Sequence, residues 1–129
     1  MEKLKVLLVC PNELPKELEI ENTLKVKQEL VEGLIEVFYI DDKEDICLIG
    51  NEEGKIHNLK PNRFIGNELI YGNIIVIGDD YEVGDFKSLT RKQIKKYQEY
   101  FNQTSIDKTN SKLAARKIAY ELFKRRVKR

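Results

Sequence analysis

The stretch from Gly72 to Gly78 (GNIIVIG) is the most β-prone segment of the chain. Its four consecutive Ile and Val residues do not alternate with polar residues, which predicts a central strand buried on both faces. Leu4 to Cys10 (LKVLLVC) predicts a second buried strand, which ends at Pro11 because proline cannot donate a backbone hydrogen bond. Leu34 to Ile40 (LIEVFYI) is rich in branched and aromatic residues and predicts a third strand.

Shorter segments predict the rest of the sheet. Ile46 to Ile49 predicts a strand, and Glu68 to Tyr71 predicts a short edge strand. Between them, Asn51-Glu52-Glu53-Gly54-Lys55 predicts a tight turn with Gly54 in the left-handed conformation, followed by a strand from Lys55 to Leu59. Loops or irregular connections are expected over residues 11–21, 41–45, 61–67 and 79–85.

The first predicted helix follows the loop at residues 11–21. Asn22 or Thr23 can accept a hydrogen bond at its start, and the helix runs to about Glu32. Gly33 suits the left-handed position just after a helix. Four apolar residues are expected to form its inner stripe: Leu24, Val26, Leu30 and Val31.

A second helix is predicted to begin at Ser88 or Thr90. Thr90 and Gln93 have the spacing of a capping box, in which each side chain satisfies a free backbone N–H of the first turn. Ile94, Tyr97 and Phe101 are spaced by three and four residues and therefore share one apolar face.

The C-terminal region is polar and then basic. Residues 102–111 (NQTSIDKTNS) predict a linker, and residues 112–128 predict a last helix with apolar residues on one side. Its cations crowd the C-terminal end, where they complement the helix dipole, which is a purely structural explanation for them. In a helix, Lys117, Lys124 and Lys128 would also form one stripe.

Together these elements predict an α+β fold. Because strands mostly follow strands, we expect a mostly antiparallel sheet of about five strands in the order β-α-β-β-β-β, with one packing helix and two C-terminal helices. The predicted organisation is an α+β domain over residues 1–101, a polar linker over 102–111 and a basic helix over 112–129.

Composition indicates a cytoplasmic protein. No segment approaches the roughly 18 apolar residues of a membrane span, and the few apolar residues before Pro11 do not make a signal peptide. Cys10 and Cys47 both lie in apolar runs, which suits reduced cysteines better than a disulfide framework. With 129 residues, the chain can bury a core without cross-links.

The formal net charge of +1 conceals a strong segregation of charge along the chain. Residues 1–86 carry 19 acidic and 9 basic side chains, whereas residues 87–129 carry 3 acidic and 14 basic ones. The basic part can contact an anionic partner such as nucleic acid, or it can dock on the acidic body. The candidate nucleic-acid contacts are Lys112, Arg116, Lys117, Lys124, Arg125, Arg126, Lys128 and Arg129, which Lys92, Lys95 and Lys96 can extend.

A second candidate site is a polar group that the predicted turn and the following loop bring together. Its members are Asn51, Glu53, Lys55, Asn58, Asn62 and Arg63. Asn and Gly at turns serve backbone geometry, so a structural role accounts for much of this group. Lys55 and Arg63 are harder to explain in this way, and they can bind a carboxylate or phosphate of a ligand.

Patterns for catalysis, metals and cofactors are weak. His57 is the single histidine, and a three-residue loop at 52–54 would place Cys47 diagonally from it on one face of a hairpin. The acidic loop at 79–85 lacks the glycine and the closing glutamate of a calcium loop. The isolated glycines form neither a dinucleotide-binding pattern nor a Walker A pattern. We therefore expect no catalytic residues, no metal and no cofactor.

The motifs also occur in a recognisable order. They are Val31-Glu32-Gly33-Leu34-Ile35-Glu36, Asn51-Glu52-Glu53-Gly54-Lys55, Asn58-Leu59-Lys60-Pro61-Asn62-Arg63, Gly72 to Gly78 and Phe86-Lys87-Ser88-Leu89-Thr90. Over about residues 4–101 this order resembles an uncharacterised family of small proteins, a domain of unknown function found on phages, plasmids and other mobile elements of Firmicutes and related bacteria. The resemblance implies a genomic setting rather than a reaction, and residues 102–129 lie outside it.

Three functions are compatible with the sequence. The first is a non-enzymatic binding protein of a mobile element, which regulates or counters a host system by contact with a host macromolecule. The second is a nucleic-acid-binding accessory protein that uses the basic C-terminal helix. The third is a small-ligand binder or cryptic hydrolase around Lys55, His57 and Arg63.

Overall fold

The computed structural model describes residues 2–40, 45–102 and 115–119. The elements follow one another along the chain in the order β1 (Lys3–Val9), β2 (Lys16–Glu21), α1 (Leu24–Val31), β3 (Ile35–Ile40), β4 (Ile46–Asn51), β5 (Pro61–Ile65), β6 (Glu68–Tyr71), β7 (Ile74–Asp80), β8 (Asp85–Lys87), α2 (Arg91–Tyr100) and β9 (Ala115–Ala119). Among the described residues, neither helix is long and apolar enough to cross a membrane.

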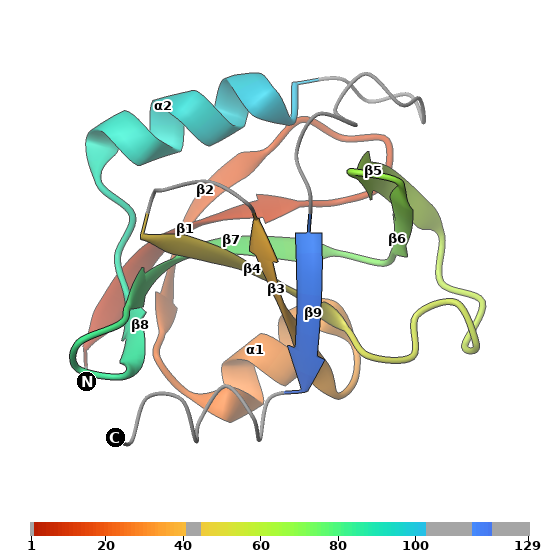
Figure 1. Cartoon of the computed structure of the whole chain (residues 1–129), viewed down its shortest axis with the longest axis horizontal. Helices are drawn as coiled ribbons and strands as arrows, with labels where there is room; N and C mark the ends of the chain where they lie inside the picture. The colour runs from red at the N-terminus through yellow and green to blue at the C-terminus, as the bar shows by residue number, and fades with distance from the viewer. Residues whose placement is uncertain (1, 41–44, 103–114, 120–129) are drawn as a thin grey trace.

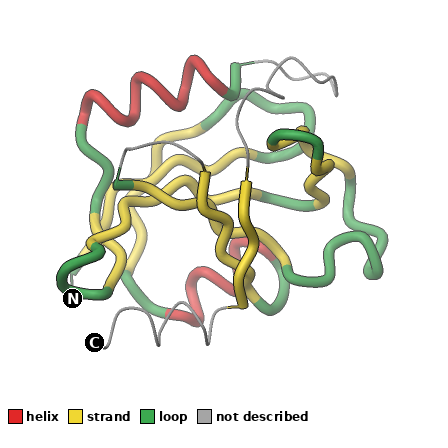
Figure 2. The backbone as a smooth tube through the Cα atoms, viewed as in Figure 1, coloured by secondary structure: helices red, strands yellow, loops and turns green. Residues whose placement is uncertain are grey.

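The fold is α+β, with a mostly antiparallel sheet, as the sequence predicts. The main sheet has the strand order β2-β1-β7-β4-β3-β9, and β8 also pairs with β7. Strands β5 and β6 form a separate two-stranded sheet. The helices lie on opposite sides of the main sheet, with α2 above it and α1 below it in Figures 1 and 2.

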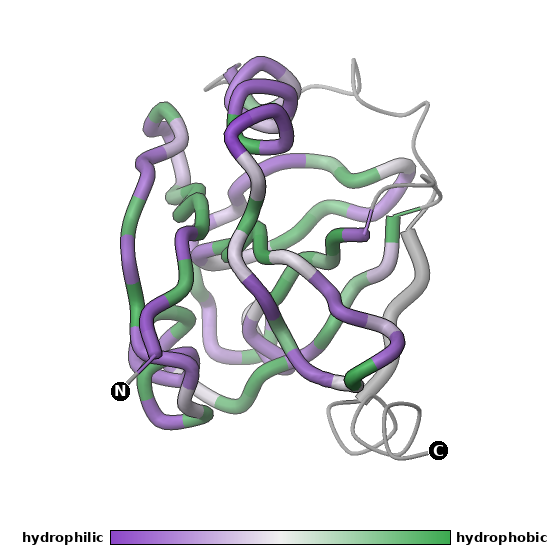
Figure 3. The backbone as a smooth tube through the Cα atoms, turned by 90° about the vertical axis from the view of Figure 1, so that its left-hand side faces the viewer, coloured by the Kyte–Doolittle hydropathy of each residue, from purple (hydrophilic) through white to green (hydrophobic). Residues whose placement is uncertain are grey.

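The core consists of two apolar layers, one on each face of the sheet. Successive residues of β7 alternate between them, so that Ile74 and Val76 face α2 and the β5–β6 sheet while Ile75 and Ile77 face α1. All four side chains are buried, which confirms the central strand predicted from GNIIVIG. Figure 3 shows the outer side of α2 as mainly hydrophilic, consistent with a helix that contributes one apolar face.

Both helices begin as predicted. The Thr23 hydroxyl accepts a hydrogen bond from the backbone N–H of Val26, and Thr90 with Gln93 forms a complete capping box. Ile94, Tyr97 and Phe101 are fully buried. These local signals require only residues three or four positions apart, so they can be identified in the sequence.

The number of strands is higher than predicted, because the described residues form nine strands rather than about five. Residues 16–21, which the sequence predicts as a loop, form β2 and pair with β1 from Lys3 to Leu8. Leu18 and Ile20 alternate with glutamates in this strand. Residues 61–65, 79–80 and 85, which belong to the predicted loops at 61–67 and 79–85, also lie in strands. In each case, backbone pairing with a partner strand outweighs a weak local preference.

One predicted strand is wrong. Residues 55–59 form successive turns, in which the N–H of His57 bonds to the carbonyl of Glu53 and that of Leu59 bonds to the carbonyl of Gly54. Gly54 is not in the left-handed conformation, which Asn58 adopts instead with φ 57°. A Cβ at Gly54 would meet the Tyr71 carbonyl oxygen at 2.5 Å, so glycine is needed here for close approach to β6.

The predicted helix over residues 112–128 is wrong where the structure can test it. Residues Ala115–Ala119 form β9, which pairs with β3 from Glu36↔Ala119 to Ile40↔Ala115. The pairing satisfies backbone groups along β3, which a helix in this segment could not do. The remaining residues of the predicted linker and helix, 103–114 and 120–129, lie outside the described residues.

Helix α1 differs in detail from its prediction because a lysine replaces a leucine on its inner side. Leu24 is exposed, whereas Lys27 is only 2% exposed. The Lys27 Nζ donates to Asn22 Oδ1 at 2.7 Å and to the Thr23 carbonyl at 3.2 Å, and it lies 4.7 Å from the centre of the Phe86 ring. The left-handed residue at the helix end is Glu32 rather than Gly33.

Burial of Lys27 makes stability depend on pH. Burial lowers the pKa of Lys27 from 10.5 to about 8, while the nearby Asp85 carboxylate opposes that shift. Between these two values the unfolded chain binds more protons than the folded chain, so stability rises with pH. Relative to Lys27→Met, we expect the wild-type protein to gain about 1–2 kcal/mol between about pH 7.5 and 9.5 in urea unfolding. An unchanged difference between the two proteins would contradict this expectation.

Candidate functional site

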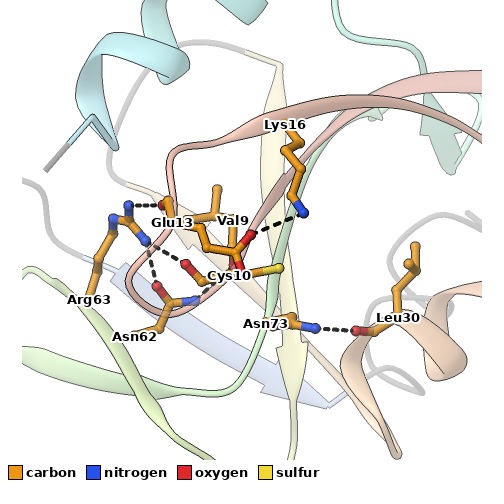
Figure 4. Close-up of polar contacts among 8 residues, drawn as sticks. All are labelled: Val9, Cys10, Glu13, Lys16, Leu30, Asn62, Arg63 and Asn73. Carbon is orange, nitrogen blue, oxygen red and sulfur yellow. Dashed lines mark hydrogen bonds and ion pairs between the residues drawn. The ribbon is translucent and has the colours of Figure 1, made fainter. Parts of the chain in front are cut away.

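A buried arginine fixes the region between β1, β5 and the end of α2. Arg63, on β5, is 2% exposed. Its Nη1 donates to the carbonyl of Cys10 at 3.1 Å, and its Nη2 donates to the carbonyls of Glu13 at 2.6 Å and Phe101 at 2.9 Å. Burial lowers the pKa of the Arg63 guanidinium, although an arginine stays protonated at physiological pH. Arg63 therefore joins β5 to the loop after β1 and to the end of α2, and Figure 4 shows its contacts with Cys10, Glu13 and Asn62.

Asn62 extends this network on the neighbouring position of β5. Its Oδ1 accepts a hydrogen bond from Arg63 Nη1 at 2.7 Å. Its Nδ2 donates to the carbonyls of Val9 and Gly72, each at 2.8 Å, and the side chain is completely buried. The amide thus links the end of β1 to the residues just before β7.

A groove of about 460 Å³ lies over this network. We name it the β1-end groove and define it by the residues that line it: Cys10, Pro11, Glu13, Glu32, Asn58, Leu59, Lys60, Gly72 and Asn73. Its walls are joined to one another, because the N–H of Gly72 donates to the Lys60 carbonyl at 2.7 Å. Asn73 Nδ2 donates to the carbonyl of Leu30 at 2.9 Å and so ties the groove to α1.

The rim of the groove carries charges of both signs. Glu13, Glu32 and Lys60 are exposed, and Glu13 forms an ion pair with Lys16 at 3.0 Å. Burial raises the pKa of the Cys10 thiol, with a smaller contribution in the same direction from Glu13. The thiol is therefore protonated at neutral pH, and the groove offers hydrogen bonding and charge recognition rather than a reactive thiolate.

A second, smaller hollow of about 200 Å³ lies between the β5–β6 sheet and strands β3 and β4. We name it the acidic pocket, since three glutamates and one lysine are among its lining residues: Glu36, Phe38, Asn51, Glu52, Gly54, Lys55, Glu68, Leu69, Ile70 and Tyr71. Asn51 is buried there, and its Nδ2 donates to the carbonyls of Val31 and Glu32 at 2.9 and 3.1 Å. Asn51 therefore caps the C-terminal end of α1.

The six residues predicted as one ligand site do not form one site. Asn62 and Arg63 lie beneath the β1-end groove, and Asn58 lies on its surface. Asn51 and Lys55 line the acidic pocket. Glu53 is exposed beside His57, with 3.7 Å between Oε1 and Nε2. The sequence predicts Arg63 as a ligand contact, but the hydrogen bonds described above go to the protein's own oxygen atoms.

The hypothetical Cys47–His57 pair also depends on the hairpin that does not form. Cys47 is fully buried in the layer that faces α1, whereas the His57 side chain is 54% exposed in the loop at residues 52–59. The structure thus places the thiol and the imidazole in different surroundings. In the residues that the structure describes, no group of three or more His, Cys, Asp or Glu side chains is arranged to hold a metal ion.

The predicted nucleic-acid contacts lie mostly beyond the described residues. Arg116 and Lys117 lie on β9, opposite Tyr39 and Phe38 of β3. The other six are in segments that the structure does not describe: Lys112, Lys124, Arg125, Arg126, Lys128 and Arg129. On α2, Lys92, Lys95 and Lys96 are exposed, while Arg91 forms two 3.1 Å contacts with the Glu17 carboxylate.

Several groove residues were not identified from the sequence. Cys10, Glu13, Glu32, Lys60 and Asn73 come from four separate segments, and no spacing rule relates them. One signal was available, because the Asn62-Arg63 pair sits next to apolar residues in a segment that otherwise looks like a loop. A buried polar side chain implies partners nearby, and those partners are backbone carbonyls that a sequence does not reveal.

Most of the described fold lies within a region that matches one protein family. A family described as "Domain of unknown function (DUF3846)" matches residues 4–102. The chain belongs to this family. The match runs from the second residue of β1 to just beyond α2, so the groove and its buried network lie within the DUF3846 domain. It agrees with the extent of about 4–101 expected from the order of the motifs, and β9 lies beyond it.

Comparison with curated proteins gave no significant match, and neither did comparison with solved structures.

Replacement of Arg63 should destabilise the domain strongly. Arg63→Met leaves the carbonyls of Cys10, Glu13 and Phe101 without these donors, and we expect a loss of about 3 kcal/mol or more in urea unfolding. Arg63→Lys keeps the charge but loses the planar fork and should cost about 2 kcal/mol. Lys55→Met, at an exposed position, should stay within about 0.5 kcal/mol of wild type. An Arg63→Met variant as stable as Lys55→Met would contradict a structural role for Arg63.

Proposed function

We propose that this DUF3846 protein is a non-enzymatic binding protein of a mobile genetic element. It acts in the host cytoplasm by contact with a host macromolecule, in a regulatory or counter-defence role. The observation that carries the proposal is the β1-end groove, whose walls are fixed in place before any partner binds. A preformed surface loses little conformational entropy on binding, so the free-energy cost of ordering the site is small.

The size and the composition of the groove support recognition. A volume of about 460 Å³ lies in the range of roughly 300–1,000 Å³ typical of ligand sites. The rim presents Glu32 and Lys60, and the floor includes Leu59 and Gly72. Charges at the rim around a less polar floor are typical of sites that orient a partner by electrostatics and hold it by burial.

Charge reversal at the rim tests the groove. The double variant Glu32→Lys with Lys60→Glu keeps the net charge and alters only exposed side chains. Tagged wild-type protein is used to capture partners from host lysate, and binding of each purified partner is then measured by titration. We expect the groove variant to bind at least about tenfold more weakly, a loss of about 1.4 kcal/mol. The matched control, Lys92→Glu with Glu99→Lys on α2, should bind like wild type.

Equal binding by the groove variant and wild type would reject the groove as the contact surface. Loss of binding in the α2 control instead would move the contact surface to the basic side of α2. Unfolding curves of the variants separate either outcome from a general loss of structure.

Nucleic-acid binding is a second candidate, favoured by the exposed Lys92, Lys95 and Lys96 of α2 together with the basic C-terminal residues. Phosphate contacts of this kind are strongly salt-dependent and carry little sequence specificity. A deletion of residues 110–129 would also remove β9, so charge-neutralising variants give a cleaner experiment.

For that candidate, the triple variant Lys124→Ala, Arg125→Ala and Arg126→Ala should weaken binding to duplex DNA or RNA. The wild-type affinity should fall by orders of magnitude between about 50 and 200 mM salt, and the variant should show a smaller salt slope by about two to three units. Filter binding or fluorescence anisotropy measures both quantities. Identical slopes would contradict a role for the basic C-terminal cluster.

The third candidate, a small-ligand binder or hydrolase around Lys55, His57 and Arg63, has less support. Lys55 lines the acidic pocket, His57 is exposed beside Glu53, and Arg63 is buried beneath the β1-end groove. No observation places these three side chains around one substrate.

A further inference from the structure

Strand β9 occupies an unusual position in the chain. It lies beyond residues 4–102, the part that matches the family, yet it pairs with β3 through five residues of the main sheet. Figures 1 and 2 show it as the outermost strand beside β3. The edge of β3 is therefore covered by a strand that the DUF3846 match does not include.

The edge that β9 covers has the properties of a strand-binding edge. Residues Ile35–Ile40 (IEVFYI) carry only one charged side chain, Glu36, and have high β-propensity. An exposed edge of this kind presents a row of free backbone N–H and C=O groups, which pair readily with another extended chain. The opposite edge strand of the same sheet, β2, is protected differently, because it carries Glu17, Glu19 and Glu21.

The acidic pocket adjoins this edge and adds a chemical preference. Glu36 and Phe38 of β3 line the pocket together with Glu52, Glu68 and Tyr71. In the register of the β3–β9 pair, Lys117 is the position opposite Phe38. Carboxylates beside aromatic rings suit an ammonium or guanidinium group. The pocket volume of about 200 Å³ can accommodate one such side chain.

We propose that the β3 edge and the acidic pocket form an acceptor site for an extended polypeptide strand that carries a lysine or arginine at the position opposite Phe38. Strand β9 covers the β3 edge of this site within the same chain, and a strand of the same pattern in a partner protein competes with it. Backbone hydrogen bonds supply affinity in this mode of recognition, and the pocket supplies selectivity. This inference concerns a different surface from the β1-end groove and does not depend on it.

The competition has a quantitative consequence. A strand tethered in the same chain faces its acceptor at an effective concentration of about a millimolar, so a free peptide binds the wild-type protein poorly. Weakening β9 in place should therefore uncover the site. Adjacent residues of a strand direct their backbone N–H groups to opposite sides, so one of the N–H groups of Lys117 and Ile118 points at β3. Proline has no N–H, so the double variant Lys117→Pro with Ile118→Pro removes that hydrogen-bond donor.

The experiment uses the full chain and a fluorescent peptide of residues 112–122 (KLAARKIAYEL). Anisotropy should show that the double proline variant binds the peptide at least about tenfold more tightly than wild type does. A peptide with Lys117→Glu should bind the variant about tenfold more weakly, because it places a carboxylate near the pocket glutamates. The same peptide with both prolines is the matched control and should not bind.

Three results would overturn the proposal. The first is a folded double proline variant that does not bind the wild-type peptide. The second is equal binding of the wild-type peptide and the peptide with Lys117→Glu, which would reject the acidic pocket as the selective element. The third is a double proline variant that fails to fold, because β9 would then be an integral strand rather than an exchangeable one.

Hydrogen exchange on the wild-type protein gives an independent measurement. Amides of β3 alternate between N–H groups that point to β4 and groups that point to β9. If β9 detaches, the N–H groups that point to β9 should exchange with a lower opening free energy than the N–H groups that point to β4. Equal protection of the two groups would also overturn the proposal.

Discussion

The buried guanidinium of Arg63 constrains the rest of this structure. Removing a charge from water is costly unless hydrogen bonds replace the lost hydration, and here backbone carbonyls of Cys10, Glu13 and Phe101 supply them. Those carbonyls belong to the loop after β1 and to the end of α2, so the charge can be buried only when both segments are in place. One side chain therefore couples the sheet, the second helix and the shape of the β1-end groove.

Contacts within the fold pair some of the acidic residues of the chain with basic ones. The acidic strand β2 runs beside β1, where Lys3 pairs in register with Glu21 and Lys5 with Glu19. Arg91 at the start of α2 contacts Glu17 of the same strand. Strand β2 is thus neutralised locally, whereas the glutamates of the acidic pocket lie at the other end of the sheet, near β9. The acidic excess of residues 1–86 is therefore divided in the fold between separate surfaces, the β2 edge and the acidic pocket.

The two candidate surfaces differ in how they are built. The β1-end groove lies within the DUF3846 domain, and hydrogen bonds among its own walls hold it in shape. The β3 edge is an open backbone surface, whose cover comes from a segment beyond that domain. A preformed groove favours rapid and selective contact, whereas an edge covered by a tethered strand responds only to a partner that can compete with the tether. The combination is consistent with the proposed role of a small regulatory binding protein.

The sequence alone is enough to predict the features that depend on neighbours along the chain. It predicted the α+β class, the buried strand β7, the strands β1, β3, β4 and β6, and both helix starts, because β-propensity, apolar runs and caps act over a few residues. Residues 16–21 and 115–119 are strands only in the context of the fold, since an edge strand is stabilised by a partner distant in sequence. The burial of Lys27 and Arg63 likewise depends on the fold. The oxygen atoms that replace the hydration of these two side chains are mostly backbone carbonyls. Because every residue has a backbone carbonyl, only the folded chain shows which carbonyls converge on a charged side chain.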